Sequence, residues 1–509
     1  MQYFIGIIII ISIIELIRRA IKDQKGKWIL IGVILFLIPL FPVNIVLCVL
    51  AIRRGIKLSK SEEIDEIKKN MYSEKPRGII FGTKDDNYVI KSEDKDGHIL
   101  IVGGAGSGKS SCVAIPTLRA WKSSVFAVDI KGELKDKRQG RSVKVFEPKD
   151  RLSYGYDPYY TLRQSKNPAQ EARAIAEALI ITSSDETKEP FWIDSAKDML
   201  TGAILHFYRE YSFLETLHEI QNTRPRELIN MIYKSDNPTA KLFITSFVDL
   251  EDKTKAGIHR ELSTHIVKIV TDEDLKHALS RDKNIAPDDL ELHDIFVVVP
   301  GELLKQWKNL LTLMVNQFLN FFEQRPQYNN RPILFMLDEF PRLGKIPAIL
   351  DGVAVLRDKK ITVCPIIQSL AQLDYIYGDK ARKIIVDNCS YKVVLSAEDA
   401  DTQEYFSKMY GTYEKPQKSS GESFIGPLVL GRNKGVTEVE KRKIKPEEFA
   451  TLPSTGKLAL ITPFGNSKVA KRPYYIPYKP PPKPQKKTVI ERMFQALRRV
   501  FNSINRLIQ

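Results

Sequence analysis

A glycine-rich loop between an apolar run and a helix-forming segment narrows the fold of this chain more than any other feature. The loop, GGAGSGKS (103–110), matches the pattern G-x-x-x-x-G-K-[ST], follows HILIV (98–102) and precedes 111–120, which can form a helix. In that setting backbone N–H groups and a helix N-terminus surround phosphate oxygens. The pattern predicts an ATP site made by Gly103, Gly104, Ala105, Gly106, Ser107, Gly108, Lys109, Ser110 and Ser111.

Within this loop, two side chains have specific predicted tasks. Lys109 is expected to reach the β and γ phosphates, and Ser110 is expected to ligate the Mg²⁺ that accompanies the nucleotide. The four cysteines, Cys48, Cys112, Cys364 and Cys389, are far apart in the sequence and none lies at metal-ligand spacing. We therefore expect reduced thiols and no metal held by protein side chains alone.

Short apolar runs separated by helical stretches predict the fold class. Runs of five to eight mostly β-branched and aliphatic residues are typical of buried parallel strands. They occur at 98–104, 123–130, 294–300, 331–339, 360–367 and 391–396. The predicted fold is α/β, a P-loop doubly wound parallel sheet.

Two adjacent acids close one of these runs. Asp338 and Glu339 follow ILFML, so both are expected at the carboxyl edge of a buried strand, where doubly wound sheets bind ligands. Asp338 is expected to hold Mg²⁺ through water. Glu339 is placed to polarise the attacking water, which would make the chain an ATP hydrolase.

The pattern changes along the chain and predicts several domains. Between 165 and 290 the strand signal disappears and amphipathic helical segments follow one another, which indicates an all-helical insert. We expect an anchor at 1–52, a nucleotide-binding domain at 53–164 and 291–470 that flanks the insert, and a Pro- and Lys-rich linker at 471–487. The last segment, 488–509, has the pattern of a basic amphipathic helix suited to a membrane interface or a partner groove, or to packing on the chain's own core.

The N-terminal segment is expected to hold the chain in a membrane. Residues 28–52 are an uncharged run of 25 residues, long enough to span, whereas 3–17 is marginal. A hairpin of two spans with the ATPase domain in the cytoplasm is the favoured topology. The basic loop between the runs opposes it, because basic loops prefer the cytoplasm, and Pro39 and Pro42 would also fit a re-entrant bend.

The net charge of +16 is concentrated at the two ends. Residues 1–60 and 468–509 together carry +17, so the middle of the chain sums to about −1. The ends therefore fit an anionic inner-leaflet membrane surface, and any DNA path through the middle must be a local basic patch.

Several motifs in the same order resemble one family, the type IV secretion coupling proteins (TraG/TraD-type conjugative DNA-transfer ATPases). They are Leu337-Asp338-Glu339-Phe340-Pro341-Arg342-Leu343-Gly344, Asp129-Ile130-Lys131-Gly132-Glu133-Leu134, Pro190-Phe191-Trp192 with Ala196, and Gln368-Ser369-Leu370-Ala371-Gln372-Leu373. The resemblance spans about residues 1–470. Because Ile130 departs from the commoner D-P-K-G-E, we assign no catalytic task to Lys131 or Glu133.

The resemblance implies roles and partners that the residues alone do not. Gln368 would sense the γ-phosphate, and Arg357 would be an arginine finger for a neighbouring subunit, with Arg342 as a competitor for that role. The family's fold is RecA-like and assembles as a homo-hexamer at the bacterial inner membrane. Its ATP cycle drives single-stranded DNA with an attached relaxase or relaxosome protein, and sometimes protein substrates, toward type IV secretion channel components.

Two other functions stay open at this point. The chain could be a docking receptor for secreted effector proteins that uses ATP only for assembly. It could also be a related DNA-pumping motor in chromosome partition or repair, although no DNA-reading terminal module is recognisable.

Overall fold

The computed structural model describes residues 66–180, 190–326, 330–425 and 428–476. Contacts divide the chain into two units, Met1–Asn70 and Met71–Gln509, and the second contains every element discussed below. The predicted anchor (1–52) and the predicted terminal helix (488–509) lie outside the described residues. Within the described ranges, none of the helices combines the length and the apolar character that a membrane span requires.

One half of the central sheet consists of seven parallel strands. Nearly every residue of the inner strands is buried, as expected of strands covered on both faces. In spatial order they are β12 (Tyr391–Val394), β4 (Ile99–Val102), β11 (Ile361–Ile367), β10 (Ile333–Leu337), β5 (Ser124–Asp129), β9 (Asp294–Val298) and β6 (Val143–Phe146). All six predicted strands are confirmed, and β6 is an addition.

The other part of the same sheet is antiparallel, so the predicted doubly wound parallel sheet is confirmed for seven strands and does not extend to the other five. In order outward from β12 the strands are β15 (Lys457–Thr462), β16 (Gly465–Ala470), β2 (Ile79–Lys84), β3 (Asn87–Lys91) and β1 (Tyr72–Ser73). Two-residue turns set the direction of the pairs β2–β3 and β15–β16, because such a turn can only join antiparallel neighbours. Asp85 and Asp86, between β2 and β3, have φ of 48° and 61°, as such a turn requires.

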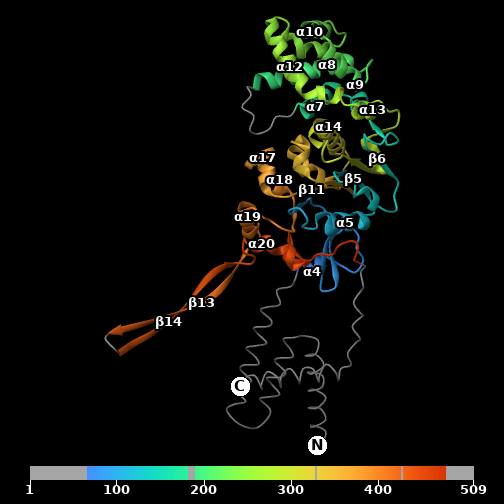
Figure 1. Cartoon of the computed structure of the whole chain (residues 1–509). Coiled ribbons are helices and arrows are strands. Elements are labelled where there is room, and N and C mark those ends of the chain that lie inside the picture. The colour runs from blue at the N-terminus through green and yellow to red at the C-terminus, as the bar shows by residue number, and fades with distance from the viewer. Residues whose placement is uncertain (1–65, 181–189, 327–329, 426–427, 477–509) are drawn as a thin grey trace, which may run out of the picture. The chain divides into compact units, whose positions relative to one another are not determined.

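Helices fill the stretch between β6 and β9, and Figure 1 shows α8, α9, α10 and α12 grouped at one end of the unit. The helices are α6 (Tyr160–Gln164), α7 (Pro168–Leu179), α8 (Pro190–Phe207), α9 (Phe213–Asn222), α10 (Pro225–Tyr233), α11 (Pro238–Ile244), α12 (Asp252–Val270) and α13 (Glu273–Leu279). Side chains cap several of them: Asn167 accepts the N–H of Gln170, and Ser212 with Glu215 forms a capping box.

This helical stretch begins and ends at neighbouring points of the fold. The short strands β7 (Gly155–Tyr156) and β8 (Asn284–Ile285), which precede and follow it, pair with each other. Its core is continuous with that of the sheet, since one buried apolar cluster includes Ile175 and Leu200 together with Phe126 of β5. The helices therefore leave the sheet and return to it at one place.

Further helices cover the sheet, and a separate hairpin follows α19. The helices are α5 (Ile115–Ala120), α14 (Leu304–Glu323), α15 (Pro347–Asp351), α16 (Val353–Asp358), α17 (Leu370–Tyr377), α18 (Asp379–Asn388), α19 (Ala400–Tyr410) and α20 (Glu448–Thr451). The hairpin is β13 (Thr412–Ile425) with β14 (Leu428–Arg442), a two-stranded sheet of its own. Cys112, Cys364 and Cys389 are buried free thiols.

Candidate nucleotide site

The glycine-rich loop lies between β4 and the helical segment that ends in α5, as its pattern predicted. Gly106 and Gly108 have φ of +73° and +98°, a left-handed conformation that residues with a Cβ rarely adopt. The first residue, Gly103, is tied to the sheet because its N–H donates to Ile367 O at 3.1 Å, at the end of β11. Glycine at positions 106 and 108 therefore permits a backbone conformation that would be strained for other residues.

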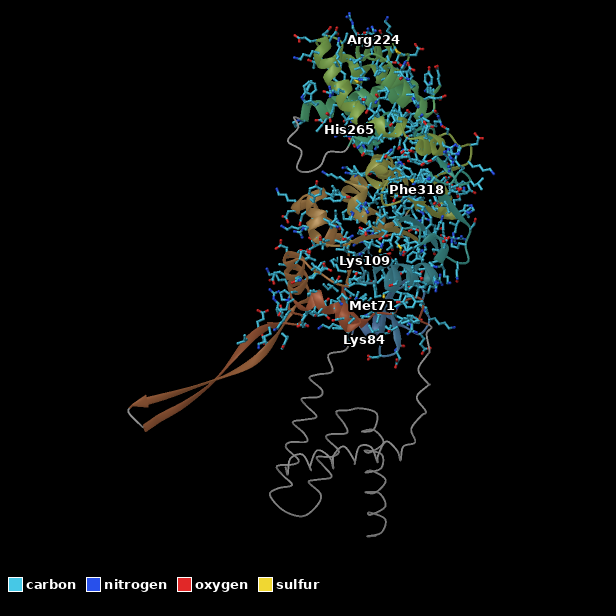
Figure 2. The ribbon with its side chains drawn as sticks, viewed as in Figure 1. Met71, Lys84, Lys109, Arg224, His265 and Phe318 are labelled. Atoms are coloured by element: carbon cyan, nitrogen blue, oxygen red, sulfur yellow. The ribbon has the colours of Figure 1, made fainter. Side chains whose placement is uncertain are left out.

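The Lys109 side chain folds back and hydrogen-bonds to the glycine-rich loop that contains it. Figure 2 labels Lys109 in the part of the molecule that contains the sheet. Its Nζ donates to Gly103 O at 2.6 Å and to Gly104 O at 3.0 Å. Burial lowers the pKa of Lys109, while the charges of Glu339 and Asp338 act in the opposite direction. The lysine therefore lies in the electrostatic field of the two acids.

The remaining loop residues fall into an exposed tip and a packed base. Ala105 and Gly106 are exposed, whereas Ser110 and Ser111 are partly buried at the start of the helical segment. Ser107 is buried, and its Oγ has no hydrogen-bond partner among the described residues. An unpaired buried hydroxyl in a loop of this type is compatible with a polar ligand that completes the site.

The two acids lie where β10 ends, at the same edge of the sheet as the loop. Asp338 and Glu339 are 5% and 9% exposed. The pKa of Asp338 is raised to about 6, mainly by burial and also by the charge of Glu339, while the charges of Lys131 and Lys109 act in the opposite direction. A nearly buried carboxyl group whose pKa is shifted by burial and by an adjacent carboxylate is a candidate functional residue.

Glu339 has two features of a functional residue. Its φ of 48° is left-handed, which is costly for a residue with a Cβ and is found most often at active sites. Its carboxylate also accepts two hydrogen bonds from Gln368 Nε2, at 3.2 Å to Oε1 and 3.0 Å to Oε2. The backbone and Gln368 together fix the direction of this carboxylate.

The strand order explains how Gln368 reaches Glu339. β11 lies between β4 and β10, and Gln368 directly follows β11, so it lies between the glycine-rich loop and the acids. Its backbone N–H donates to Gln372 Oε1 at 3.2 Å, which ties it to α17. The structure therefore brings Lys109, Asp338, Glu339 and Gln368 to one edge of the sheet.

The two candidate arginine fingers are not part of this cluster. Arg357, at the end of α16, is half exposed and pairs with Asp358 at 3.6 Å. Arg342 is exposed and donates to Gly301 O at 2.9 Å. The backbone N–H of Arg342 donates to Glu339 O at 2.8 Å, but within the described part of the chain neither guanidinium is bonded to the side chain of Lys109, Asp338 or Glu339.

Sequence reasoning missed three residues that adjoin the site. Ser396, which follows β12, accepts the N–H of Gly104 at 2.9 Å through its hydroxyl. Lys471 donates to Ser107 O at 2.9 Å. The charge of Lys131, in the loop after β5, acts on both Asp338 and Lys109, and adjacency of the β5 and β10 runs was the one available signal.

The fold is similar to that of solved conjugative coupling proteins. The plasmid coupling protein TrwB in complex with the non-hydrolysable ATP analogue ADPNP superposes with a TM-score of 0.63 at 17% identity, covering 81% of this chain and 94% of that one. TrwB in complex with ADP and Mg²⁺ gives 0.59 at 17% identity, covering 82% and 93%. At this identity the similarity establishes the α/β, RecA-like fold of TrwB for this chain.

Sequence comparison identifies the family. Protein VirD4 of Agrobacterium fabrum is 26% identical over 412 residues, which cover 76% of this chain and 60% of that protein. The conjugal transfer protein TraG of Escherichia coli is 22% identical over 427 residues, covering 73% and 66%. The chain thus spans about 60% of the VirD4 relative's length. Residues 57–497 match the model of the type IV secretory system conjugative DNA transfer family, and the chain belongs to that family.

Proposed function

We propose that this chain is a membrane-anchored, DNA-translocating ATPase that delivers single-stranded DNA with its bound relaxase, and some protein substrates, into a type IV secretion channel during conjugation. The observation that carries the proposal is the cluster of Lys109, Glu339 and Gln368 at one sheet edge, in a chain of the conjugative DNA transfer family. The TrwB complexes with ADPNP and with ADP and Mg²⁺ support ATP and Mg²⁺ as its cofactors.

The residues around the glycine-rich loop suit a magnesium nucleotide. Ser110 and Asp338 offer the oxygen ligands that Mg²⁺ prefers, and the raised pKa of Asp338 fits an acid whose charge a bound cation would stabilise. When bound, Mg²⁺ would neutralise charge on the phosphate oxygens. Lys109 would leave the carbonyls of Gly103 and Gly104 and donate to the phosphates, and the loop's N–H groups would hold them in place.

Glu339 would be the base of hydrolysis. Its fixed carboxylate would orient a water molecule and accept the proton as that water attacks. Gln368, bonded to the same carboxylate, would register whether the γ-phosphate is present. Arg357, or Arg342 in its place, would act on the nucleotide of a neighbouring subunit in a homo-hexamer, where its charge stabilises the transition state.

The domain plan forms part of the proposal. Residues 1–52 would anchor the chain in the bacterial inner membrane, with the ATPase domain (53–164 and 291–470) in the cytoplasm and the helical insert (165–290) facing cargo. The pairing of β7 with β8 supports an inserted segment. Residues 471–487 would form a linker whose first six residues pack on the ATPase domain, and 488–509 would form a second contact with the inner leaflet.

ATP turnover by the full-length chain tests this function, measured with and without single-stranded oligonucleotides. We expect turnover that depends on Mg²⁺ and is stimulated more by single strands than by duplex, with binding that weakens steeply as salt rises. The matched variant E339Q, which keeps the side chain's size and removes the base, should bind ATP and turn it over about 100-fold more slowly. Turnover by E339Q at the parent rate would overturn the assignment of the base, and turnover without any DNA response would favour a docking receptor.

A further inference from the structure

A short segment near the end of the described chain lies across the glycine-rich loop and the start of its helix. We call residues 471–476 the P-loop strap. The N–H of Tyr474 donates to Ser111 O at 2.9 Å, and Arg119 of α5 lies over the Tyr474 ring at 4.8 Å and donates to Tyr474 O at 3.4 Å. The strap directly follows β16, and the backbone N–H of Lys471 donates to Gly456 O at 2.8 Å. Its start is therefore fixed to the antiparallel edge.

Lys471 is the strap residue that touches the loop. Its Nζ donates to Ser107 O at 2.9 Å and to Leu395 O at 3.3 Å. Leu395 in turn donates its N–H to Val102 O at 2.8 Å, beside the beginning of the loop. One ammonium group thus joins the loop, the end of β12 and the strap.

The peptide bond that Lys471 contacts has a second end. In a planar trans peptide the C=O and the N–H point in opposite directions, so the Ser107 carbonyl and the Gly108 N–H lie on opposite sides of one unit. The N–H groups of such loops point at phosphates. A cation on the carbonyl polarises the peptide and strengthens its N–H as a donor, because hydrogen bonds in a chain reinforce one another.

We propose that Lys471 is a positioning residue of the nucleotide site, which holds and polarises the Ser107–Gly108 peptide from outside the loop so that the loop binds phosphate more tightly. This inference rests on the proposed function, since it assigns Lys471 to the same nucleotide site. Lys471 would contact neither the nucleotide nor the attacking water. Its effect would pass through the loop backbone.

The surroundings of Lys471 favour this role over a simple surface ion pair. The side chain is partly buried, and burial lowers its pKa. No salt bridge joins it to a carboxylate in the part of the chain that the structure describes, and its two acceptors are backbone carbonyls. Its charge therefore acts on the peptide without being neutralised by a neighbouring acid.

β16, the strand directly before the P-loop strap, supplies a matched control. Lys468 of β16 pairs with Glu448 at 3.0 Å, with both side chains more than a third exposed. Replacing Lys468 with Met removes an equal charge and an equal hydrogen-bonding group without touching the loop. K471M, K471R and K468M thus separate loss of charge at the loop from loss of charge on the strand.

The test measures the Kd of the full-length chain for Mg²⁺ with the non-hydrolysable analogue ADPNP, and the rise in unfolding temperature that this ligand produces. We expect K471M to bind about 3- to 10-fold more weakly and to gain a smaller rise, K471R to recover most of the loss, and K468M to match the parent. If K471M does not fold, K471Q, which keeps an uncharged donor, takes its place.

The outcomes distinguish this inference from the proposed function. Parent-like Kd in K471M, or equal losses in K471M and K471R, would overturn the positioning role and leave Lys471 as a structural residue. If the parent binds ADPNP and K109A does not, the nucleotide site itself is present, whatever the outcome for K471M. A parent chain that does not bind ADPNP would overturn both proposals.

Discussion

The parallel half of the sheet and its antiparallel edge differ in where their strands end. In the parallel half, β4, β11 and β10 end on the same side, and the glycine-rich loop, Gln368 and the acids Asp338 and Glu339 follow them directly. In the antiparallel edge, neighbours end on opposite sides, and two pairs, β2–β3 and β15–β16, are joined by tight turns. Strand direction therefore places the polar residues that follow the parallel strands at one edge of the sheet, and it separates those that follow the antiparallel strands.

The difference teaches which region should control chemistry and which should control stability alone. The inner parallel strands are buried at nearly every residue, whereas β1 and β16 are mostly not, and among the described residues the antiparallel edge reaches the nucleotide site through Lys471, directly after β16. Substitutions in the parallel half should change turnover. Substitutions on the antiparallel strands, Lys471 excepted, should change the free energy of unfolding or nothing.

The largest expected effect in the parallel half is that of K109A. Removing the ammonium that would meet the phosphates should lower ATP turnover by about three orders of magnitude, the size expected when one stabilising group of a transition state is lost. The measurement is steady-state phosphate release, with circular dichroism to confirm the fold and K468M as the charge-matched control. Normal turnover by a folded K109A protein would remove the motor function from this chain.

Acid should destabilise the chain through the parallel half. His98 is buried before β4, accepts the Val363 N–H at Nδ1 and contacts Val353 O through Nε2 at 2.6 Å. Burial lowers its pKa to about 4 from 6.5. Between pH 6.5 and 4 the unfolded state takes up the proton first, so the free energy of unfolding should fall by roughly 3 kcal/mol across that window.

Urea unfolding of the parent and of H98N from pH 7.5 to 4 measures this loss. H98N keeps an acceptor near Nδ1 and has no group that titrates in the window. The difference between the two stability curves should therefore shrink as pH falls from 6.5 to 4. A constant difference would show that the pKa of His98 is the same in the folded and unfolded states.

Q368A sharpens the comparison at a single contact. Without the amide, Glu339 loses both hydrogen bonds from Gln368 Nε2 that orient its carboxylate. Loss of hydrogen bonds to a charged group should reduce turnover about tenfold. The change should appear in kcat with little effect on the Kd for ADPNP, because Gln368 contacts the base and not the loop's phosphate-binding N–H groups. Equal effects on both constants would indicate that Gln368 also shapes the loop.

The smallest effect belongs to the antiparallel edge. K468M breaks the exposed pair with Glu448, and exposed pairs contribute about 0.2–1 kcal/mol, so the free energy of unfolding should change by no more than about 1 kcal/mol. Turnover should equal that of the parent. A turnover loss above about threefold would show that the antiparallel edge takes part in the chemistry beyond Lys471.

The apolar runs of the inner parallel strands were readable from the sequence, whereas the strands of the antiparallel edge were not predicted. β10 and β11 are buried at every position and stand out as apolar runs, so their places and the acids after β10 were predictable. β16, with the sequence GNSKVA, is buried only at alternate positions near its end and resembles a loop. Alternation accounts for the missed β16, but β15 and β2 are buried over five and four consecutive residues and were missed although their apolar runs were present.

By itself, the sequence determined the glycine-rich loop, the six apolar parallel strands and the acids 338 and 339, because each depends on residues close together in the chain. Only the tertiary structure decided that β11 lies between β4 and β10, which lets Gln368 bond to Glu339. It also decided that Lys471 reaches Ser107 across 364 positions. Contacts of that separation depend on how strands are ordered in the sheet, and no local periodicity encodes that order.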